Sequence, residues 1–289
     1  MISRVLVTRG PAVSRELTGL LRDRGYDVRV APLLEAQLPE DTAALRAVLD
    51  LAAGPEVPTW LTVTSANTVW ALAAIADNSD WGAALDRARA STPKLSVAAV
   101  GRATASALRQ VGIGVDFTPS HEQSAAGMLA EWPTARASAG EVALVPASEL
   151  ASSALADALA ERGYDVTTAV AYRMVPAPAA EPLQPDAPLC DDPAVLDADA
   201  ARDQCARGEF RAVVATAPSR VAALLDGLAP PPGGTRWVAI GEPTAAALRQ
   251  RGLTPVVAED PSPAALAVAM DRALEDLFKT TSSTEEKSS

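Results

Sequence analysis

The chain has few residues of the kinds that build metal centres and disulfide frameworks. Its 289 residues include two cysteines, Cys190 and Cys205, and one histidine, His121. A zinc site of the usual Cys/His type needs about four such ligands, so this composition excludes it, and it equally excludes a secreted disulfide scaffold. Because the cysteines lack a C-x-x-C spacing, we interpret them as inert. We interpret His121 as a surface loop residue and expect no bound metal.

Basic and aromatic residues are also scarce. Lys and Arg number 25 against 36 Asp and Glu, which gives a net charge of −11 and a pI near 4.7. Nucleic acids and anionic membranes need a basic surface, so neither is an expected partner. Aromatic residues make up 4% of the chain, too few for a base-stacking platform. No apolar stretch approaches the roughly 18 residues that cross a membrane, and no signal-peptide pattern is present, so we expect a cytoplasmic protein.

The motifs of nucleotide cofactors and of a hydrolytic triad are missing. No G-x-G-x-x-G follows the first strand-like run, and no glycine-rich loop ends in Gly-Lys-Ser/Thr. A Ser/His/Asp triad would have to use His121, which lies beside Ser120 in a loop without a nucleophile elbow. We therefore expect an activity that needs no cofactor.

What the chain does contain is an internal repeat. RGYDV occurs at 24–28 and at 162–166, and GRATASALRQVG at 101–112 matches GEPTAAALRQRG at 241–252. Eight of the twelve positions in the longer pair are identical. The motifs come in the same order in both halves, and their period is too long for a solenoid. The repeat therefore indicates two similar lobes, which agrees with the roughly 150 residues of a typical domain.

Each half alternates strand and helix signals. Gly25 and Gly163 are placed to end helices, and strands follow at 27–31 and 166–170. Further helices are predicted over 41–53, starting at Asp41, and over 192–207, starting at Asp192-Pro193. A fifth strand is predicted at 115–118 in one half and 255–258 in the other, each before a helix capped by serine. This pattern predicts an α/β fold with two flavodoxin-like, doubly wound parallel-sheet lobes joined by a two-segment hinge. Residues 176–191 read as an irregular connector and 279–289 as a disordered tail.

Polar residues gather where the predicted strands end. In open α/β sheets ligands bind beyond the carboxyl ends of the strands, and helix N-termini there offer backbone N–H groups to anions. The residues at these positions are Thr8, Arg9, Thr64, Ser65, Gly101 to Thr104, Ser148, Thr216, Ser219 and Gly241 to Thr244. For Thr104 and Thr244 a helix-capping role alone would explain the residue, and this alternative stays open.

Seven stretches of the chain resemble the uroporphyrinogen-III synthase family. They are LVTR (6–9), GYDVRVAPLLE (25–35), TVTSANTV (62–69), AVGRATASAL (99–108), ALVPAS (143–148), GYDVTTAVAYRMVP (163–176) and AIGEPTAAAL (239–248). Their order and spacing carry the resemblance, which covers about residues 3–278. It implies one lobe of residues 1–36 plus 175–289, including the tail, and a second lobe of residues 37–174. The sequence alone would equally allow tandem lobes, 1–132 and 139–278.

The resemblance also implies a reaction. The family converts hydroxymethylbilane, a linear tetrapyrrole rich in carboxylates, into cyclic uroporphyrinogen III without metal or cofactor. Hydroxide is lost, the substituted carbon of ring D attacks, and a spiro intermediate then fragments and recloses with ring D inverted. The implied setting is a cytoplasmic monomer of heme biosynthesis that receives the bilane in a transient hand-off from hydroxymethylbilane synthase.

By motif match, Tyr172 is implied as the general acid for the departing hydroxyl. The other interpretation, a hinge residue that packs between lobes, stays open. Ser65, Thr104 and Thr244 are implied as hydroxyl donors to the substrate. Arg9 and Arg236 are implied as cations for its carboxylates, Arg236 standing where lysine is frequent. The implied substrate-binding set is completed by the remaining strand-end residues Gly101, Ser148, Ser219 and Gly241.

Two other functions fit the sequence features less well. A two-lobed small-molecule binding or sensor protein would have the same hinged shape without catalysis. A different cytoplasmic enzyme, such as a nucleotide-sugar transferase, would need a nucleotide site, and no such motif is found.

Overall fold

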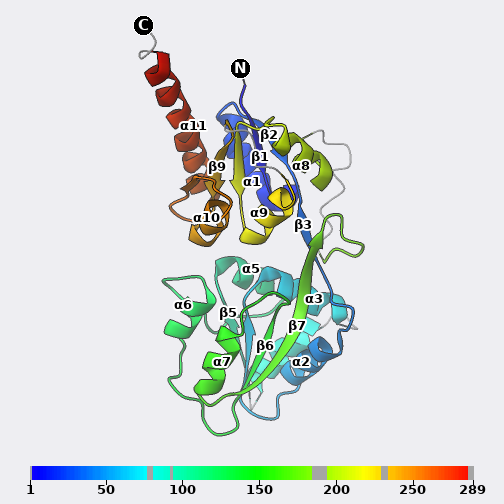
Figure 1. Cartoon of the computed structure of the whole chain (residues 1–289). Coiled ribbons are helices and arrows are strands. Elements are labelled where there is room, and N and C mark those ends of the chain that lie inside the picture. Colours follow the sequence, from blue (N-terminus) through cyan, green and yellow to red (C-terminus); the bar gives the residue numbers. More distant parts are fainter. Residues whose placement is uncertain (1, 77–80, 92–93, 184–193, 229–233, 286–289) are drawn as a thin grey trace. The chain divides into compact units, whose positions relative to one another are not determined.

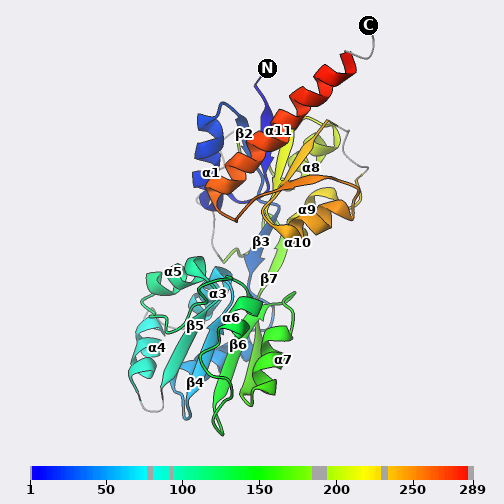
Figure 2. The same cartoon turned by 90° about the vertical axis from the view of Figure 1, so that its left-hand side faces the viewer.

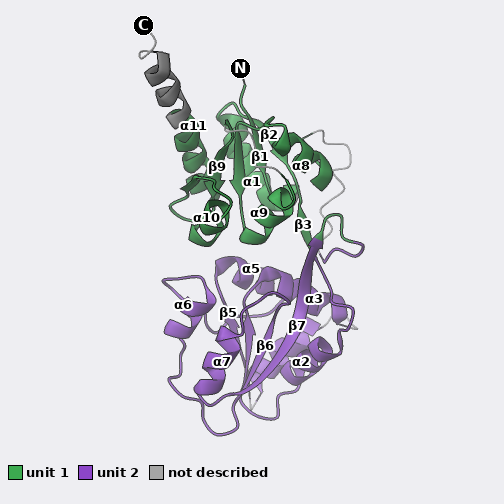
Figure 3. Ribbon diagram, viewed as in Figure 1, with its two compact units in different colours: residues 1–35, 176–179, 185–289 green, residues 36–175, 180–184 purple. Residues whose placement is uncertain are grey.

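In the computed structural model the described residues are 2–76, 81–91, 94–183, 194–228 and 234–285. They form two compact units (Figure 3). Unit 1 comprises residues 1–35, 176–179 and 185–289, and unit 2 comprises residues 36–175 and 180–184. Unit 1 is therefore assembled from the two ends of the chain, and unit 2 from its middle.

Unit 1 is a five-stranded parallel sheet with helices on both faces (Figure 1). The strand order is β10-β9-β8-β1-β2, which in chain order within the unit is 5-4-3-1-2, the flavodoxin-like arrangement. Its elements are β1 (Arg4–Val7), α1 (Pro11–Asp23), β2 (Asp27–Val30), α8 (Ala198–Ala206), β8 (Ala212–Ala215), α9 (Pro218–Leu225), β9 (Arg236–Ala239), α10 (Glu242–Arg249), β10 (Pro255–Val257) and α11 (Pro263–Glu285).

Successive side chains along the strands of unit 1 point to opposite faces of the sheet, so this unit has a separate core on each face. Val5 and Val7 pack with α1 and α11, whereas Leu6, which points the other way, packs with α8, α9 and α10. Figure 2 shows α1 on one side of this sheet and α9 and α10 on the other. Because both faces are buried, each strand can be apolar throughout, as the run Val5-Leu6-Val7 is.

Unit 2 has a sheet of order β3-β7-β6-β4-β5, in which β7, β6, β4 and β5 are parallel. Leu144 of β6 packs with α2 to α5, and its neighbours Ala143 and Val145 pack with α6 and α7 on the other face. Its elements are β3 (Leu34–Gln37), α2 (Ala43–Ala53), β4 (Thr59–Val63), α3 (Ala66–Ile75), α4 (Trp81–Ala90), β5 (Leu95–Ala99), α5 (Arg102–Gln110), α6 (Ala125–Ala130), β6 (Val142–Ser148), α7 (Ala154–Glu161) and β7 (Asp165–Pro176). The predicted class, α/β with two doubly wound parallel-sheet units, is confirmed.

Two of the predicted helix ends have the expected geometry. Gly25 and Gly163 follow α1 and α7 with φ of 84° and 93°, in the left-handed region that glycine adopts without strain. The chain then enters β2 and β7 directly, so the repeated GYDV motif is a helix stop followed by a strand.

The fifth strand differs between the units. Residues 255–257 form β10 as predicted, but at 115–118 only the single bridge between Ala98 and Phe117 forms. The Asp116 carboxylate accepts the Val97 N–H at 2.8 Å, which takes a donor that a fifth strand would otherwise pair. Side-chain hydrogen bonding here replaces part of a backbone ladder.

Two other boundaries differ from the prediction. Helix α8 begins at Ala198, not at residue 193, because the Asp197 carboxylate caps it by accepting the Ala200 N–H at 2.7 Å. The predicted start at Asp192-Pro193, together with Cys190 and residues 184–191 of the Pro-rich connector, lies outside the described residues.

The predicted disordered tail also differs in part. Helix α11 continues to Glu285, so residues 279–285 are helical, and residues 286–289 lie outside the described residues. After Pro263 this stretch contains neither proline nor glycine. Each residue added to an existing helix gains one backbone hydrogen bond without a new nucleation cost, which favours continuation.

Candidate active site

The strand-end edge of unit 1 begins with two threonines. Thr8, directly after β1, donates its hydroxyl to the Val214 carbonyl at 3.0 Å, and its oxygen lies 3.4 Å from the hydroxyl of Thr216 after β8. Both side chains are buried. They tie the ends of two parallel strands together and place the next residues of each strand at one edge.

Arg9 follows Thr8 at this edge. It is half-buried, and burial lowers the pKa of its guanidinium. Within the described part of the chain, no carboxylate forms an ion pair with Arg9. Because desolvating a cation without a counter-ion is unfavourable, this position is stabilised by any anion that reaches it.

Two helices of unit 1 begin at the same edge with uncapped N-termini. The residue before α9 is Ala217 and the residue before α10 is Gly241, and neither has a side chain that can accept a backbone N–H. Ser219 lies in the first turn of α9, and Thr244, 2% exposed, lies in the first turn of α10. The capping interpretation of Thr244 is therefore wrong, since the cap position belongs to Gly241. Pro218 and Pro243 have no N–H, and the Arg220 N–H donates to the Ala217 carbonyl at 3.1 Å. The N–H groups left for an anion are therefore that of Ser219 in α9 and those of Glu242 and Thr244 in α10.

Arg236 is not brought to this edge. It is the first residue of β9 and pairs in register with Ala212, the first residue of β8. In a parallel sheet this is the amino-terminal edge, roughly 10 Å from the strand ends at about 3.3 Å per residue. Its Nε is buried and has no hydrogen-bond partner among the described residues.

In unit 2, Ser65 and Gly101 occupy the equivalent cap positions before α3 and α5. The Ser65 hydroxyl oxygen accepts the Asn67 N–H at 3.1 Å, so this serine caps its helix. Before α5 the cap is Gly101, and Thr104, 4% exposed, stands three residues later inside the helix. The capping interpretation of Thr104 is therefore wrong as well.

A third threonine of this kind escaped the sequence analysis. Thr68 stands three residues after Ser65, just as Thr104 follows Gly101 and Thr244 follows Gly241. Its side chain is fully buried, and its hydroxyl has no partner among the described residues. The common spacing, cap-x-x-Thr, was the signal that could have identified it. An unpaired buried hydroxyl is costly to the fold, which makes Thr68 a candidate donor to a ligand.

Ser148 and Tyr172 are neighbours on adjacent strands of unit 2. They are partners in the register of β6 and β7, after a register shift between Ala147 and Ser148. The Glu149 N–H donates to the Tyr172 carbonyl at 2.9 Å and extends the pairing by one residue. The Tyr172 ring packs in the core beside α2 to α5 at 8% exposure, while its hydroxyl has no partner among the described residues. A phenol held in this way can donate a proton to a ligand.

The remaining residues with reactive side chains do not gather at either edge. His121 is 89% exposed on a loop, as interpreted from the sequence. Cys205 is buried in unit 1, and burial raises the pKa of its thiol to about 11, which keeps it protonated. In the described ranges no three His, Cys, Asp or Glu side chains are grouped as metal ligands, and no helix is long and apolar enough to span a bilayer.

Each unit thus presents hydroxyl groups and helix N-termini at the carboxyl ends of parallel strands. In doubly wound α/β proteins, the class to which this fold belongs, ligands bind at such strand ends, and helix N-termini there favour anions. Two solved structures share the fold. A mutant uroporphyrinogen III synthase from the bacterium Thermus thermophilus is 23% identical with a TM-score of 0.59, over 95% of this chain and 99% of that chain. The uroporphyrinogen-III synthetase of Helicobacter pylori is 17% identical with a TM-score of 0.56, over the same shares.

The sequence profile described as uroporphyrinogen-III synthase HemD matches residues 15–267. The chain belongs to the uroporphyrinogen-III synthase family, as the motifs predicted. Comparison with curated proteins gave no match. The family is one of cyclising hydro-lyases of porphyrin and heme biosynthesis that act on a tetrapyrrole.

Proposed function

We propose that each strand-end edge binds carboxylates of hydroxymethylbilane while the chain closes this substrate to uroporphyrinogen III with loss of water. The activity follows from the family. The observation that carries the binding assignment is Arg9, a half-buried cation without an internal counter-ion among the described residues. A carboxylate that pairs with Arg9 forms a charge-assisted hydrogen bond, the strongest kind available at this edge.

The other members of the binding set are neutral donors. They are the open first turns of α9 and α10 with Ser219, Gly241 and Thr244, and, in unit 2, Ser65, Gly101, Thr104 and Ser148. Neutral N–H and O–H donors can hold carboxylates without the cationic surface that this acidic chain lacks. Arg236 is left out of the proposed set because it lies at the opposite end of its strand.

We assign the proton transfer to Tyr172. Its hydroxyl donates a proton to the departing hydroxyl of the substrate, which leaves as water. The substituted carbon of ring D then attacks the methylene carbon freed by that departure. The spiro intermediate fragments at the bond between ring D and its original methylene bridge, and that methylene carbon then bonds to the free α carbon of ring D, which inverts the ring. The proton lost from this α carbon balances the proton that Tyr172 donated. Since the chain must be held so that the right carbon attacks, positioning contributes more than the proton transfer.

The proposed activity is tested with hydroxymethylbilane generated enzymatically in the same vessel. The protein should increase the rate of ring closure and direct it to isomer III, since unassisted closure gives the symmetric isomer I. A binding or sensor protein would retain the bilane without changing the isomer ratio. Isomer I alone, at the uncatalysed rate, would refute the proposed function.

The setting of the reaction is also proposed. We expect a cytoplasmic monomer that receives the bilane from hydroxymethylbilane synthase in a transient hand-off. Sedimentation at increasing protein concentration checks the monomer. Adding a trap for free bilane to the coupled reaction checks the hand-off, because a directly transferred substrate would escape the trap.

A further inference from the structure

One side chain from outside α5 lies over the first turn of that helix. The Gln123 Oε1 accepts the Arg102 N–H at 2.9 Å. A Cβ added at Gly101 would lie 2.4 Å from this oxygen and 2.9 Å from the Gln123 Cβ, distances that real Cβ atoms do not reach. Gln123 therefore fills the space that any other residue at position 101 would need.

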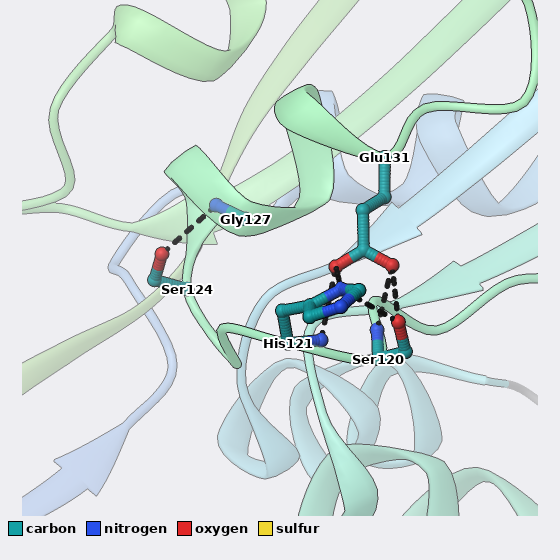
Figure 4. A network of polar contacts seen from close by, with 5 residues as sticks. All are labelled: Ser120, His121, Ser124, Gly127 and Glu131. Atoms are coloured by element: carbon teal, nitrogen blue, oxygen red, sulfur yellow. Dashed lines mark hydrogen bonds and ion pairs between the residues drawn. The ribbon is translucent and has the colours of Figure 1, made fainter.

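The segment that carries Gln123 is held from both ends (Figure 4). At one end the Glu131 carboxylate accepts the N–H groups of Ser120 and His121 at 2.9 and 3.0 Å and the Ser120 hydroxyl at 2.6 Å. These hydrogen bonds lower the pKa of Glu131 to about 2, with the Ser120 hydroxyl the largest cause. At the other end the Ser124 hydroxyl oxygen accepts the Gly127 N–H at 3.0 Å. These contacts hold both ends of the segment 120–124, and within it the exposed Gln123 side chain makes its hydrogen bond to the Arg102 N–H.

The fold itself does not require this contact. In the repeat, Gly241 corresponds to Gly101, yet no atom of the described residues lies within 4 Å of a Cβ added there. Helix α10 forms without such a cover. The contact in unit 2 therefore has a role that the stability of the turn alone does not explain.

The chemistry of the covering group suggests that role. Gln123 takes one of the free N–H groups of the first turn and leaves those of Ala103 and Thr104 without an intrahelical partner. Its amide is neutral, so the positive end of the α5 dipole stays uncompensated, whereas a carboxylate cap would compensate it. A turn fixed in this way keeps its attraction for an anionic ligand.

We propose that Gln123 is a positioning residue of the cyclisation reaction. It holds the turn Gly101–Thr104 so that the Ala103 and Thr104 donors meet a substrate carboxylate, and it does so without adding negative charge. The proposal rests on the function proposed above. It assigns Gln123 no contact with the reacting atoms.

The first experiment examines the contact without activity. Gly101→Ala should lower the melting temperature by several degrees, since Gln123 must move aside. In the double variant Gly101→Ala/Gln123→Gly the Cβ at position 123 is removed as well, so the added methyl group has room. Its melting temperature should equal that of Gln123→Gly within about one degree. If the decrease in melting temperature of the double variant equals the sum of the decreases of the two single variants, the assigned contact is wrong.

The second experiment separates positioning from a structural role. Gln123→Glu keeps an acceptor for the Arg102 N–H but places a carboxylate at the turn. The melting temperature should be unchanged or raised, while KM for hydroxymethylbilane rises about fivefold with kcat within twofold, an effect that high salt reduces. The matched control is Gln110→Glu, at the last residue of the same helix, which makes the same change in net charge.

The outcomes distinguish the two proposals. If the unaltered protein forms no isomer III, the proposed function fails. If it forms isomer III and Gln123→Glu has the KM of the unaltered protein, only the positioning role fails. A KM increase that Gln110→Glu reproduces would mean a general charge effect and would equally overturn the role.

Discussion

The two strand-end edges differ in what occupies the helix N-termini that they present. In unit 1 the cap positions Ala217 and Gly241 leave the first turns of α9 and α10 open, and Arg9 adds a cation without an internal partner among the described residues. In unit 2 Ser65 caps α3 and Gln123 covers the turn before α5. A duplicated sequence has thus produced one edge whose helix N-termini have no side-chain cap and one where Ser65 and Gln123 each take a backbone N–H.

The difference suggests a division of work. Open N–H groups and a cation suit unit 1 for holding carboxylates, whereas unit 2 alone supplies a phenol, Tyr172, with an unpartnered hydroxyl among its described residues. Unit 2 would then serve the reacting end of the substrate. The following predictions test this comparison, starting with the largest expected effect.

Tyr172→Phe removes the proposed acid of unit 2. Turnover should fall about 10- to 100-fold, at the low end of what general acids contribute, because unassisted closure also occurs. The residual product should still be mainly isomer III, since positioning is kept. Initial rates and isomer ratios of the folded variant measure this. Tyr26→Phe, which removes a phenol bonded to Asp271 in unit 1, is the control. A loss below twofold would favour a packing role for Tyr172.

Arg9→Ala removes the cation of unit 1. KM should rise about tenfold with little change in kcat, because a hydrogen bond to a charged group contributes roughly 1.5–3 kcal/mol to binding and this loss falls on ground state and transition state alike. Arg9→Lys should recover part of the loss, and the exposed Arg22 on α1 provides an Arg→Ala control. If KM stays constant, carboxylate binding does not depend on this edge as proposed.

Gly101→Ala and Gly241→Ala compare the two turns directly. The first should cost about 1–2 kcal/mol of unfolding free energy, from a lost hydrogen bond and a displaced side chain. The second should leave stability unchanged or raise it by up to about 1 kcal/mol, since the position is open and its backbone is extended. Urea unfolding with equal m values measures the pair, and equal losses would remove the structural contrast between the units.

Acid should weaken the support of the unit 2 turn. The pKa of Glu131 is about 2 in the folded chain against 4.5 for the free group. A carboxylate whose pKa is lower in the folded chain than in the unfolded chain stabilises the fold when it is ionised. This contribution is complete above about pH 4.5 and is lost as the pH falls through about 2. The melting temperature of the unaltered protein should therefore approach that of Glu131→Gln between pH 5 and pH 2. If the melting temperatures of the two proteins differ by the same amount at every pH, the lowered pKa of Glu131 is contradicted.

The sequence by itself determined the class of fold and the positions of its turns. Helix stops at Gly25 and Gly163, caps at Ser124 and Ser262, and apolar runs such as Val5-Leu6-Val7 depend on local geometry and on burial of both sheet faces. The sequence motifs indicated the family, and the sequence profile confirmed it. The cap-x-x-Thr spacing also stood in the sequence, although Thr68 was overlooked there.

Only the tertiary structure decided how the pieces combine. The repeat allowed tandem lobes as well as the division in which the two chain ends form unit 1, because identical local motifs do not encode which strands pair over some 200 residues. The register of β8 and β9 placed Arg236 at the edge opposite the strand ends, and the Asp116 carboxylate reduced a predicted strand to a single bridge. The contact of Gln123 with Gly101 joins residues 22 positions apart through a loop held by Glu131. Such contacts arise where different segments pack together. Propensity and periodicity describe each segment separately, so they could not reveal these contacts.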